Sequence, residues 1–406
     1  MTTRRFATLW LAFSMGFAAF EAHAVEVRTN PGIRVQSDDG VFAAYVGGRI
    51  LMDGALYDND DIGPGNVPGI QARQMRIEVG GSAYGWNFTT EMEFADNVPE
   101  LMLGFVSTQI GQAEFRIGHI LPYMTLDARN SSLQVTFTER ALLTSMLWPI
   151  YRWGMAYTGY TDKTFYHASV YNLDNDDSKT TDGWGAITRL GFDPVYSDRS
   201  SLHFGGGFAL EQYGFSNAID EETGEHEAQG LRLRLLPAGR IATDSRVTMI
   251  DINNGRRLDA YKFALETSGS RGRWSYQAEY GRGIYDDGVE EGELSGYYGY
   301  VSYFLTDDTR PYDHKLGRYV RVRPRGSHGA FEIAARYQHA HGEQGPVSGA
   351  LTRDIDIDAV SGVINWYRNP FVRFTLDITH ARTEDAVAQA RLDATTTATF
   401  RVQLDY

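Results

Sequence analysis

The feature that most constrains this chain is a repeated alternation of apolar and polar residues with a period of two. It continues to the last residue, where TTTATFRVQLDY places Ala398, Phe400, Val402, Leu404 and Tyr406 on one face. Such alternation predicts β-strands with one apolar and one polar face. These strands could belong to a soluble sandwich, or to a barrel whose apolar face meets lipid and whose polar face meets a wet lumen.

Sixteen segments show this alternation, each of about the ten residues that a tilted transmembrane strand requires. They span 41–57, 72–82, 84–95, 100–109, 112–120, 152–161, 164–173, 183–193, 201–212, 258–268, 272–282, 295–305, 329–339, 358–368, 371–381 and 395–406. Two short alternating pieces, 231–236 and 246–250, would raise the count to 18 if they paired within the same sheet. The sequence therefore predicts an all-β protein, a 16-stranded antiparallel transmembrane β-barrel with 18 strands as the alternative.

The connections between these segments alternate between long and short. Long connections include YDNDDIGPGNVPGIQ, 121–151, 213–257 and YDDGVEEGEL, whereas their partners are as short as SGSR and NP. This segregation is typical of outer-membrane barrels, which carry long external loops and short periplasmic turns. DNVPE is short where a long loop is expected, and 306–327 is long where a turn is expected. The last strand runs to the chain end because it must pair with the first to close the sheet.

The N-terminus resembles an export signal. Arg4 and Arg5 precede an apolar run over 6–20, and Ala22-His23-Ala24 has the pattern of a cleavage site. This predicts a signal peptide over 1–24, cleaved after Ala24, because the run is short for a bilayer span of about 20 residues. The expected mature domain, 25–406, would then lie in the outer membrane.

Charge and composition narrow the class of protein further. The formal net charge is −14 and there is no cysteine, so we expect no nucleic-acid partner and no disulfide. The acidic balance fits solvated external loops. The mean hydropathy of −0.35 is compatible with a barrel, because alternating strands average to polar values.

Several stretches resemble one family, the phosphate- and polyphosphate-selective porins O and P of Gram-negative outer membranes. They are VGGRILMDGALYDND at 46–60, QARQMRIEVGGSAYGWNFTTEMEFAD at 71–96, FRIGHILPYMTLDARNSS at 115–132, FTERALL at 137–143, GRYVRVRPRGSHGAFEIAARYQH at 317–339 and the final RVQLDY. The resemblance implies a 16-stranded barrel, usually a homotrimer, in which 121–151 folds inward as a constriction loop. It also implies passive diffusion of small anions such as phosphate or polyphosphate, with membrane lipid and lipopolysaccharide as further partners. The stretch 317–339 includes the second half of the unusually long turn.

The polar parity of each strand predicts which charges line the pore. Candidate anion-binding residues are Arg49, Arg76, Arg116, Arg152, Arg189, Arg336, Arg373 and Arg401 on strands, with Arg129 and Arg140 in the loop; Arg273 shares the predicted lumen parity. The expected lumen carboxylates are Asp53, Glu78, Glu91, Glu93, Glu114, Glu279, Glu332 and Asp377, with Glu139 in the loop. Arginine stays charged and presents a fork that matches phosphate or carboxylate oxygens. The four lysines all lie outside 121–151, so any basic ladder here is made of arginine.

Alternative interpretations stay open at this point. The arginines could pair with the lumen carboxylates and only stiffen the barrel, which would leave a weakly selective general porin. A plugged structural barrel or an enzymatic barrel is the third possibility. No G-x-S-x-G motif or cysteine nucleophile is present, so we expect no enzyme, no catalytic residues and no cofactor.

Two motifs resemble metal sites. DNDDIG at 58–63 resembles the start of a calcium loop, but Ile62 occupies a ligand position and Gly69 replaces the closing glutamate. His339 and His341 place two imidazoles on one strand face at the base of a loop. We interpret the first as a solvated loop and the second as a polar strand end, and we expect no metal.

Overall fold

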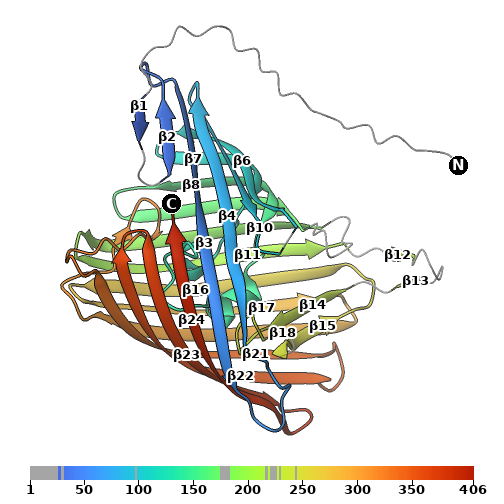
Figure 1. The fold of residues 1–406 in the computed structure, drawn as a ribbon. Helices are drawn as coiled ribbons and strands as arrows, with labels where there is room; N and C mark the ends of the chain where they lie inside the picture. The colour runs from blue at the N-terminus through green and yellow to red at the C-terminus, as the bar shows by residue number, and fades with distance from the viewer. Residues whose placement is uncertain are drawn as a thin grey trace, which may run out of the picture.

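The chain forms one closed, tilted β-barrel, seen as a ribbon in Figure 1. The computed structural model describes residues 26–28, 32–96, 98–173, 183–214, 218–219, 226–227, 230–242 and 245–406. Eighteen strands share one antiparallel sheet, and sixteen of them make up the barrel. These are β3 (Phe42–Asp58), β4 (Gly69–Ala83), β5 (Trp86–Glu93), β6 (Glu100–Ile110), β7 (Ala113–Ile120), β8 (Arg152–Tyr160), β9 (Thr164–Asn172), β10 (Trp184–Ser197), β11 (Ser200–Tyr213), β16 (Leu258–Arg271), β17 (Trp274–Asp286), β18 (Glu290–Phe304), β21 (Ala330–Pro346), β22 (Arg353–Asn369), β23 (Val372–Asp385) and β24 (Ala390–Asp405).

The last strand closes the barrel on the first, as the terminal alternation predicts. β24 pairs with β3 from Thr396 opposite Asp58 to Asp405 opposite Arg49; Figure 1 shows the two side by side, in red and blue. The backbone N–H of Gly48 donates to the carbonyl of Tyr406 at 2.8 Å. The C-terminal residue is therefore part of the seam, where it satisfies backbone groups that lipid could not.

The sixteen-strand count is confirmed, and the alternative of eighteen barrel strands is wrong. The two short alternating pieces form a separate hairpin, β14 (Leu231–Leu235) with β15 (Val247–Ile252). The two extra strands of the large sheet are instead β1 (Glu26–Arg28) and β2 (Ile33–Gln36), which extend it beside β3. This hairpin lies inside the barrel and is not part of its wall. Its apolar side chains, such as those of Met249 and Ile250, are fully buried there.

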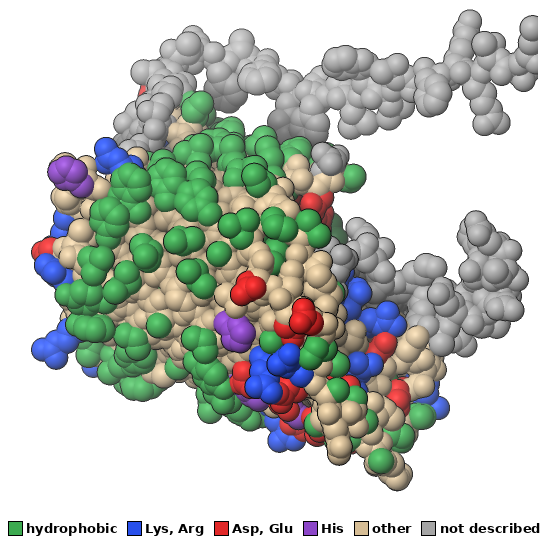
Figure 2. All heavy atoms as spheres, turned by 60° about the horizontal axis from the view of Figure 1, so that its bottom comes forward, with side chains coloured by type: hydrophobic (Ala, Val, Ile, Leu, Met, Phe, Trp, Pro, Cys, Tyr) green, Lys and Arg blue, Asp and Glu red, His purple; other side chains and the backbone are tan. Residues whose placement is uncertain are grey.

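The outer face of the barrel is apolar. Figure 2 shows hydrophobic side chains spread over one face, with charged groups gathered toward the edges. Trp274 and Trp366 lie near the short turns, and Trp366 stacks between Phe331 and Phe374. Aromatic residues at this height mark the interface between lipid and water in membrane barrels.

Several strands are longer than the alternation predicts. β17 and β18 continue through much of YDDGVEEGEL, so that only 287–289 connect them. β21 to β24 likewise extend by several residues at the long-loop end. The long loops expected here are therefore extended hairpins, because antiparallel pairing keeps satisfying backbone groups beyond the bilayer, where side chains no longer need to alternate.

Three of the described segments lie within the lumen. The loop 121–151 enters from the long-loop end and carries α1 (Leu126–Arg129) and α2 (Leu142–Leu147). The segment 305–329, with β19 (Tyr312–Asp313) and β20 (Arg318–Tyr319), enters from the short-turn end. The β14–β15 hairpin packs with α2 on apolar wall residues that include Leu294 and Ile357. The unexpectedly long turn is thus an inward-folded segment.

The remaining pair of strands, β12 (Ala218–Ile219) and β13 (His226–Glu227), forms a small separate sheet. Among the described residues, no helix has the length and apolar character needed to cross a membrane. The predicted signal peptide over 1–24 lies outside the described residues.

Candidate functional site

The loop 121–151 owes its shape to a few polar side chains. Thr125 caps α1 by accepting from the N–H of Ala128. The buried carboxylate of Asp127 accepts from the hydroxyl of Thr144 at 2.7 Å and from the N–H of Ala141 at 3.3 Å. Arg140 donates to the carbonyls of Asp127 and Asn130. The two short helices are therefore held together within the lumen.

Side chains of the barrel wall hold the backbone of this loop. Asn365 donates to the carbonyl of Thr136 at 2.9 Å, Arg373 to Val135 at 2.7 Å, Arg336 to Glu139 at 3.0 Å and Gln403 to Leu133 at 3.2 Å; Asp377 accepts from the N–H of Thr138 at 2.9 Å. Small wall residues also make room, since a Cβ at Gly207 would collide with the carbonyl of Met124. Buried backbone groups need such partners, and here strands far apart in sequence provide them.

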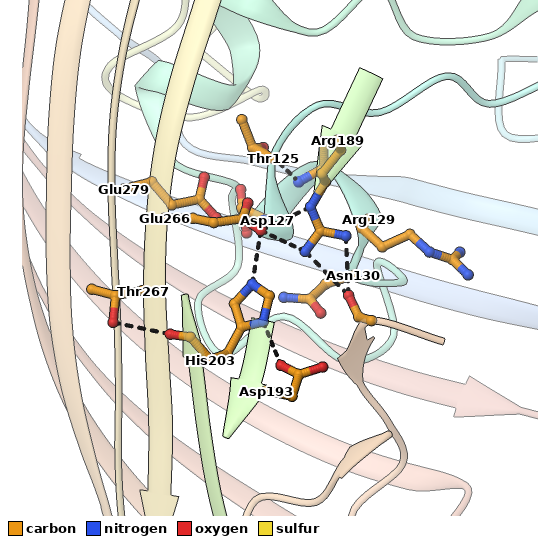
Figure 3. A network of polar contacts seen from close by, with 12 residues as sticks. Thr125, Asp127, Arg129, Asn130, Arg189, Asp193, His203, Glu266, Thr267 and Glu279 are labelled. Atoms are coloured by element: carbon orange, nitrogen blue, oxygen red, sulfur yellow. Dashed lines mark hydrogen bonds and ion pairs between the residues drawn. The ribbon is translucent and has the colours of Figure 1, made fainter. Parts of the chain in front are cut away.

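A buried polar network ties the segment 305–329 to the wall (Figure 3). Glu266 accepts from Arg189 at 2.7 Å and contacts His203 at 2.8 Å. His203 in turn lies 2.6 Å from Asp193, whose second oxygen lies 2.6 Å from His314. All four wall residues of this network are fully buried. Arg189 also donates to the carbonyl of Gly317 at 3.2 Å, so its charge is engaged in holding this segment.

The two inward segments meet at the C-terminal end of α1. Arg129 donates from Nε to the carbonyl of Leu316 at 3.1 Å, and the N–H of Tyr319 donates to Asn130 at 3.0 Å. Residues that are distant in the sequence thereby come into contact inside the barrel.

Six of the ten predicted arginines have carboxylate partners. Arg76 lies 2.7 Å from Glu91 and 2.6 Å from Glu93, Arg401 binds Asp53 through two contacts of 2.6 Å, Arg116 lies 2.6 Å from Glu114, and Arg140 lies 3.8 Å from Asp127; Arg49 pairs with Glu91, and Arg189 with Glu266. Mutual neutralisation of this kind stiffens the wall and weakens each charge toward a passing ion.

The other four bind no carboxylate within 4.0 Å in the described part of the chain. Arg129, Arg336 and Arg373 donate to backbone carbonyls of the inward segments, as described above, and Arg152 donates to the carbonyl of Tyr151 at 3.2 Å. A carbonyl orients a guanidinium without cancelling its charge. These four arginines therefore keep their positive charge around the loop.

Three arginines inside the barrel influence one another, and we call them the arginine cluster: Arg116, Arg129 and Arg318. Burial, and then the nearby Arg129 and Arg116, lower the pKa of Arg318 to about 9. Burial, together with Arg116 and Arg189, also lowers the pKa of Arg129. Such shifts report mutual repulsion in a poorly solvated region. Arg318 stays charged at neutral pH, so the cluster is a site of positive potential.

Arg318 is a residue that period-two reasoning missed. It lies in β20, inside the segment that was expected to be a turn. Its place in GRYVRVRPRGS, one of the family-like stretches, was the only available signal.

A second charged region surrounds Glu139. Arg73 lies 3.2 Å from Glu139 and Arg401 lies 3.8 Å away. Although burial raises it, Arg73, Arg401 and Arg240 hold the pKa of Glu139 near 2. The parity of β4 hides Arg73, because Leu51 pairs with Gln74 and Met52 with Ala72, which leaves Arg73 as the extra residue of a bulge in β4. A bulge of this kind turns a side chain to the other face.

One predicted lumen position is wrong. Arg273 lies in the tight turn between β16 and β17, is 41% exposed and sits 3.8 Å from Asp307. β17 begins at Trp274, two residues later than the predicted 272, so the side chain lies at the rim and not on the lumen wall.

The closed sixteen-strand barrel with an inward loop defines the class of outer-membrane porins, and solved structures share this fold. OmpT of Vibrio cholerae, in a variant that lacks loop L8, matches with a TM-score of 0.57 at 10% identity, covering 90% of this chain and 100% of that chain. The anion-selective porin from Comamonas acidovorans matches with a TM-score of 0.57 at 11% identity, with the same coverage.

Sequence comparison gives the family. The model of the phosphate-selective porin O and P family matches residues 45–406. Porin O of Pseudomonas aeruginosa is 25% identical over 393 residues, which cover 89% of this chain and 87% of the relative. The chain belongs to the phosphate-selective porin O and P family. It is therefore an outer-membrane channel protein and not an enzyme.

Proposed function

We propose that this porin conducts small anions selectively and that the arginine cluster is the element that selects them. The observation that carries the proposal is the meeting of Arg129 and Arg318, from opposite ends of the barrel, without a carboxylate partner among the described residues. Selectivity in a pore follows from the charged groups at its narrowest part. An anion in this region would offset the repulsion between the guanidinium groups.

The preferred solute under this proposal is a small oxyanion such as phosphate. The forked guanidinium matches two oxygens of phosphate at once, whereas chloride accepts from a single point. Weaker anion-binding positions along the lumen would be provided by Arg152, Arg336 and Arg373. Binding has to be weak and repeated, or the ion would not leave.

Phosphate added to a chloride-conducting pore tests this preference. In a planar bilayer, we expect phosphate at neutral pH to reduce the chloride conductance in a saturable manner, because it occupies the arginine cluster for longer. Methylphosphonate, which has one oxygen fewer, is the matched control and should block less. A chloride conductance that is unaffected by phosphate would contradict the oxyanion preference.

A weakly selective general porin is the second candidate. It is favoured by the six predicted arginines that pair with carboxylates and by the net charge of −14. Under this alternative the remaining positive charges are too few to reject cations.

We also propose export by cleavage after Ala24 and assembly as a homotrimer in contact with lipopolysaccharide. The trimer is supported by the resemblance to OmpT of Vibrio cholerae in its trimer form, with a TM-score of 0.55 at 11% identity, covering 90% of this chain and 100% of that chain.

A further inference from the structure

The outer surface of the barrel carries a row of histidines and carboxylates that conduction does not use. His341 pairs across strands with Asp356, and His339 with Asp358, where β21 and β22 approach their connecting turn. These side chains point outward, since Tyr337 on the same face of β21 is 44% exposed. The hydroxyl of Tyr337 donates to Asp358 at 2.6 Å, so the polar row begins where the aromatic residues end.

The geometry of this row brings three metal-ligating groups together. His341 Nδ1 lies 3.0 Å from Asp356 Oδ1 and 3.7 Å from Asp354 Oδ1. One ligand atom from each of His341, Asp354 and Asp356 lies within 4.8 Å of the other two. Glu343 is close as well, with Oε2 3.6 Å from His341 Nε2.

The local charge favours a cation. Among the residues that the structure describes, no arginine or lysine forms an ion pair with Asp354, Asp356 or Glu343. The nearby arginines are engaged elsewhere on this surface, Arg282 with Glu293 and Arg382 with Glu384. His339 and His341 therefore face four carboxylates, those of Asp354, Asp356, Asp358 and Glu343. At neutral pH this leaves a net negative surface on which a divalent ion would be attracted.

We propose that His341, Asp354 and Asp356 bind a zinc ion on the outer face of the barrel. One imidazole nitrogen and two carboxylate oxygens form a ligand set that zinc accepts, with the fourth position open to water or to Glu343. The ligand oxygens of Asp356 and Asp354 lie 3.0 Å and 3.7 Å from His341 Nδ1, which is close to the separation of ligands that each sit about 2.0–2.2 Å from one zinc ion.

The position on paired strands favours binding. β21 and β22 pair continuously from Ala330 opposite Tyr367 to Gln344 opposite Arg353. The ligands are therefore presented by rigid elements rather than by a loop. A bound ion would join the two strands near their turn and stabilise the extended hairpin. The site is independent of the proposed anion selectivity.

Isothermal titration of the purified, chelator-treated full chain in detergent with ZnCl2 tests the proposal. We expect one zinc ion per chain. His341→Ala and Asp356→Asn should each weaken binding by at least about tenfold, since even the loss of an outer-shell partner costs that much in metal sites. His380→Ala is the matched control, because His380 is another outward histidine and contacts only Thr396 among the described hydrogen bonds. It should bind zinc as the unaltered chain does.

Two results would overturn the proposal. One is zinc binding of equal affinity in the unaltered chain and in both His341→Ala and Asp356→Asn. The other is binding of CaCl2 as tightly as ZnCl2 with no dependence on His341, which would indicate an acidic surface without a transition-metal site. Circular dichroism of each variant establishes that its barrel is folded, so that lost binding reports on the site.

Discussion

The double variant Arg129→Gln/Arg318→Gln should lower the permeability of the pore to anions relative to cations by about tenfold or more. Two charges at 6–8 Å interact by roughly 2–3 kcal/mol at the effective dielectric constant of about 20 that suits a protein surface. Screening by salt reduces this value, and a tenfold change requires only about 1.4 kcal/mol. Glutamine removes the charge of the arginine side chain but remains a polar side chain that can donate hydrogen bonds. The measurement is the reversal potential of each channel across a KCl gradient.

Two controls make this result specific. Glu139→Gln removes a negative charge that pairs with Arg73, so it should shift the reversal potential in the opposite direction, toward greater anion selectivity. Arg273→Gln removes a positive charge at the rim and should change the potential little. An unaltered potential in the double variant, with normal conductance, would show that the arginine cluster does not select ions.

Glu266→Gln should lower the free energy of unfolding by about 3 kcal/mol or more. Glu266 is fully buried and accepts from Arg189 while contacting His203. Removing its charge leaves Arg189 without its carboxylate in a poorly solvated place, and breaking a buried pair typically costs about 3–5 kcal/mol. Arg189 also binds the carbonyl of Gly317, so the segment 305–329 should loosen. Denaturant unfolding in detergent, followed by tryptophan fluorescence, measures the loss.

Glu384→Gln is the matched control for this experiment. Glu384 pairs with Arg382 on the surface, where both side chains are exposed. Exposed pairs contribute about 0–1 kcal/mol, so this variant should unfold nearly as the unaltered chain does. Equal losses in the two variants would mean that the buried network contributes no more than a surface ion pair.

The barrel itself was predictable because its cause is local. A strand that separates lipid from water must alternate, so residues such as Phe400 and Leu404 reveal their face without knowledge of their neighbours. Sixteen strands, the closing role of the C-terminus and the unusual length of the turn at 306–327 could be recognised from this pattern and from the family-like stretches, whereas the inward course of that turn could not.

The site was less predictable because its partners are distant in the chain. Parity places Arg189 in the lumen, but only the fold brings it to Glu266 and Gly317. A bulge at Arg73 itself hid its face, and Arg318 lies in a segment that was expected to be only a turn. The apolar wall that receives the β14–β15 hairpin also breaks the rule that lumen faces are polar, because part of this lumen is a packed core.

The most direct test of anion selectivity is the sign of the reversal potential of the unaltered protein in a planar bilayer across a tenfold KCl gradient. Chloride and potassium have nearly equal mobility in water, so the sign reports the fixed charge of the pore. An anion-selective potential is the result expected if Arg129 and Arg318 dominate the electrostatic potential inside the pore. A potential near zero or of cation-selective sign would contradict it, because the lumen carboxylates would then balance or outweigh the arginines.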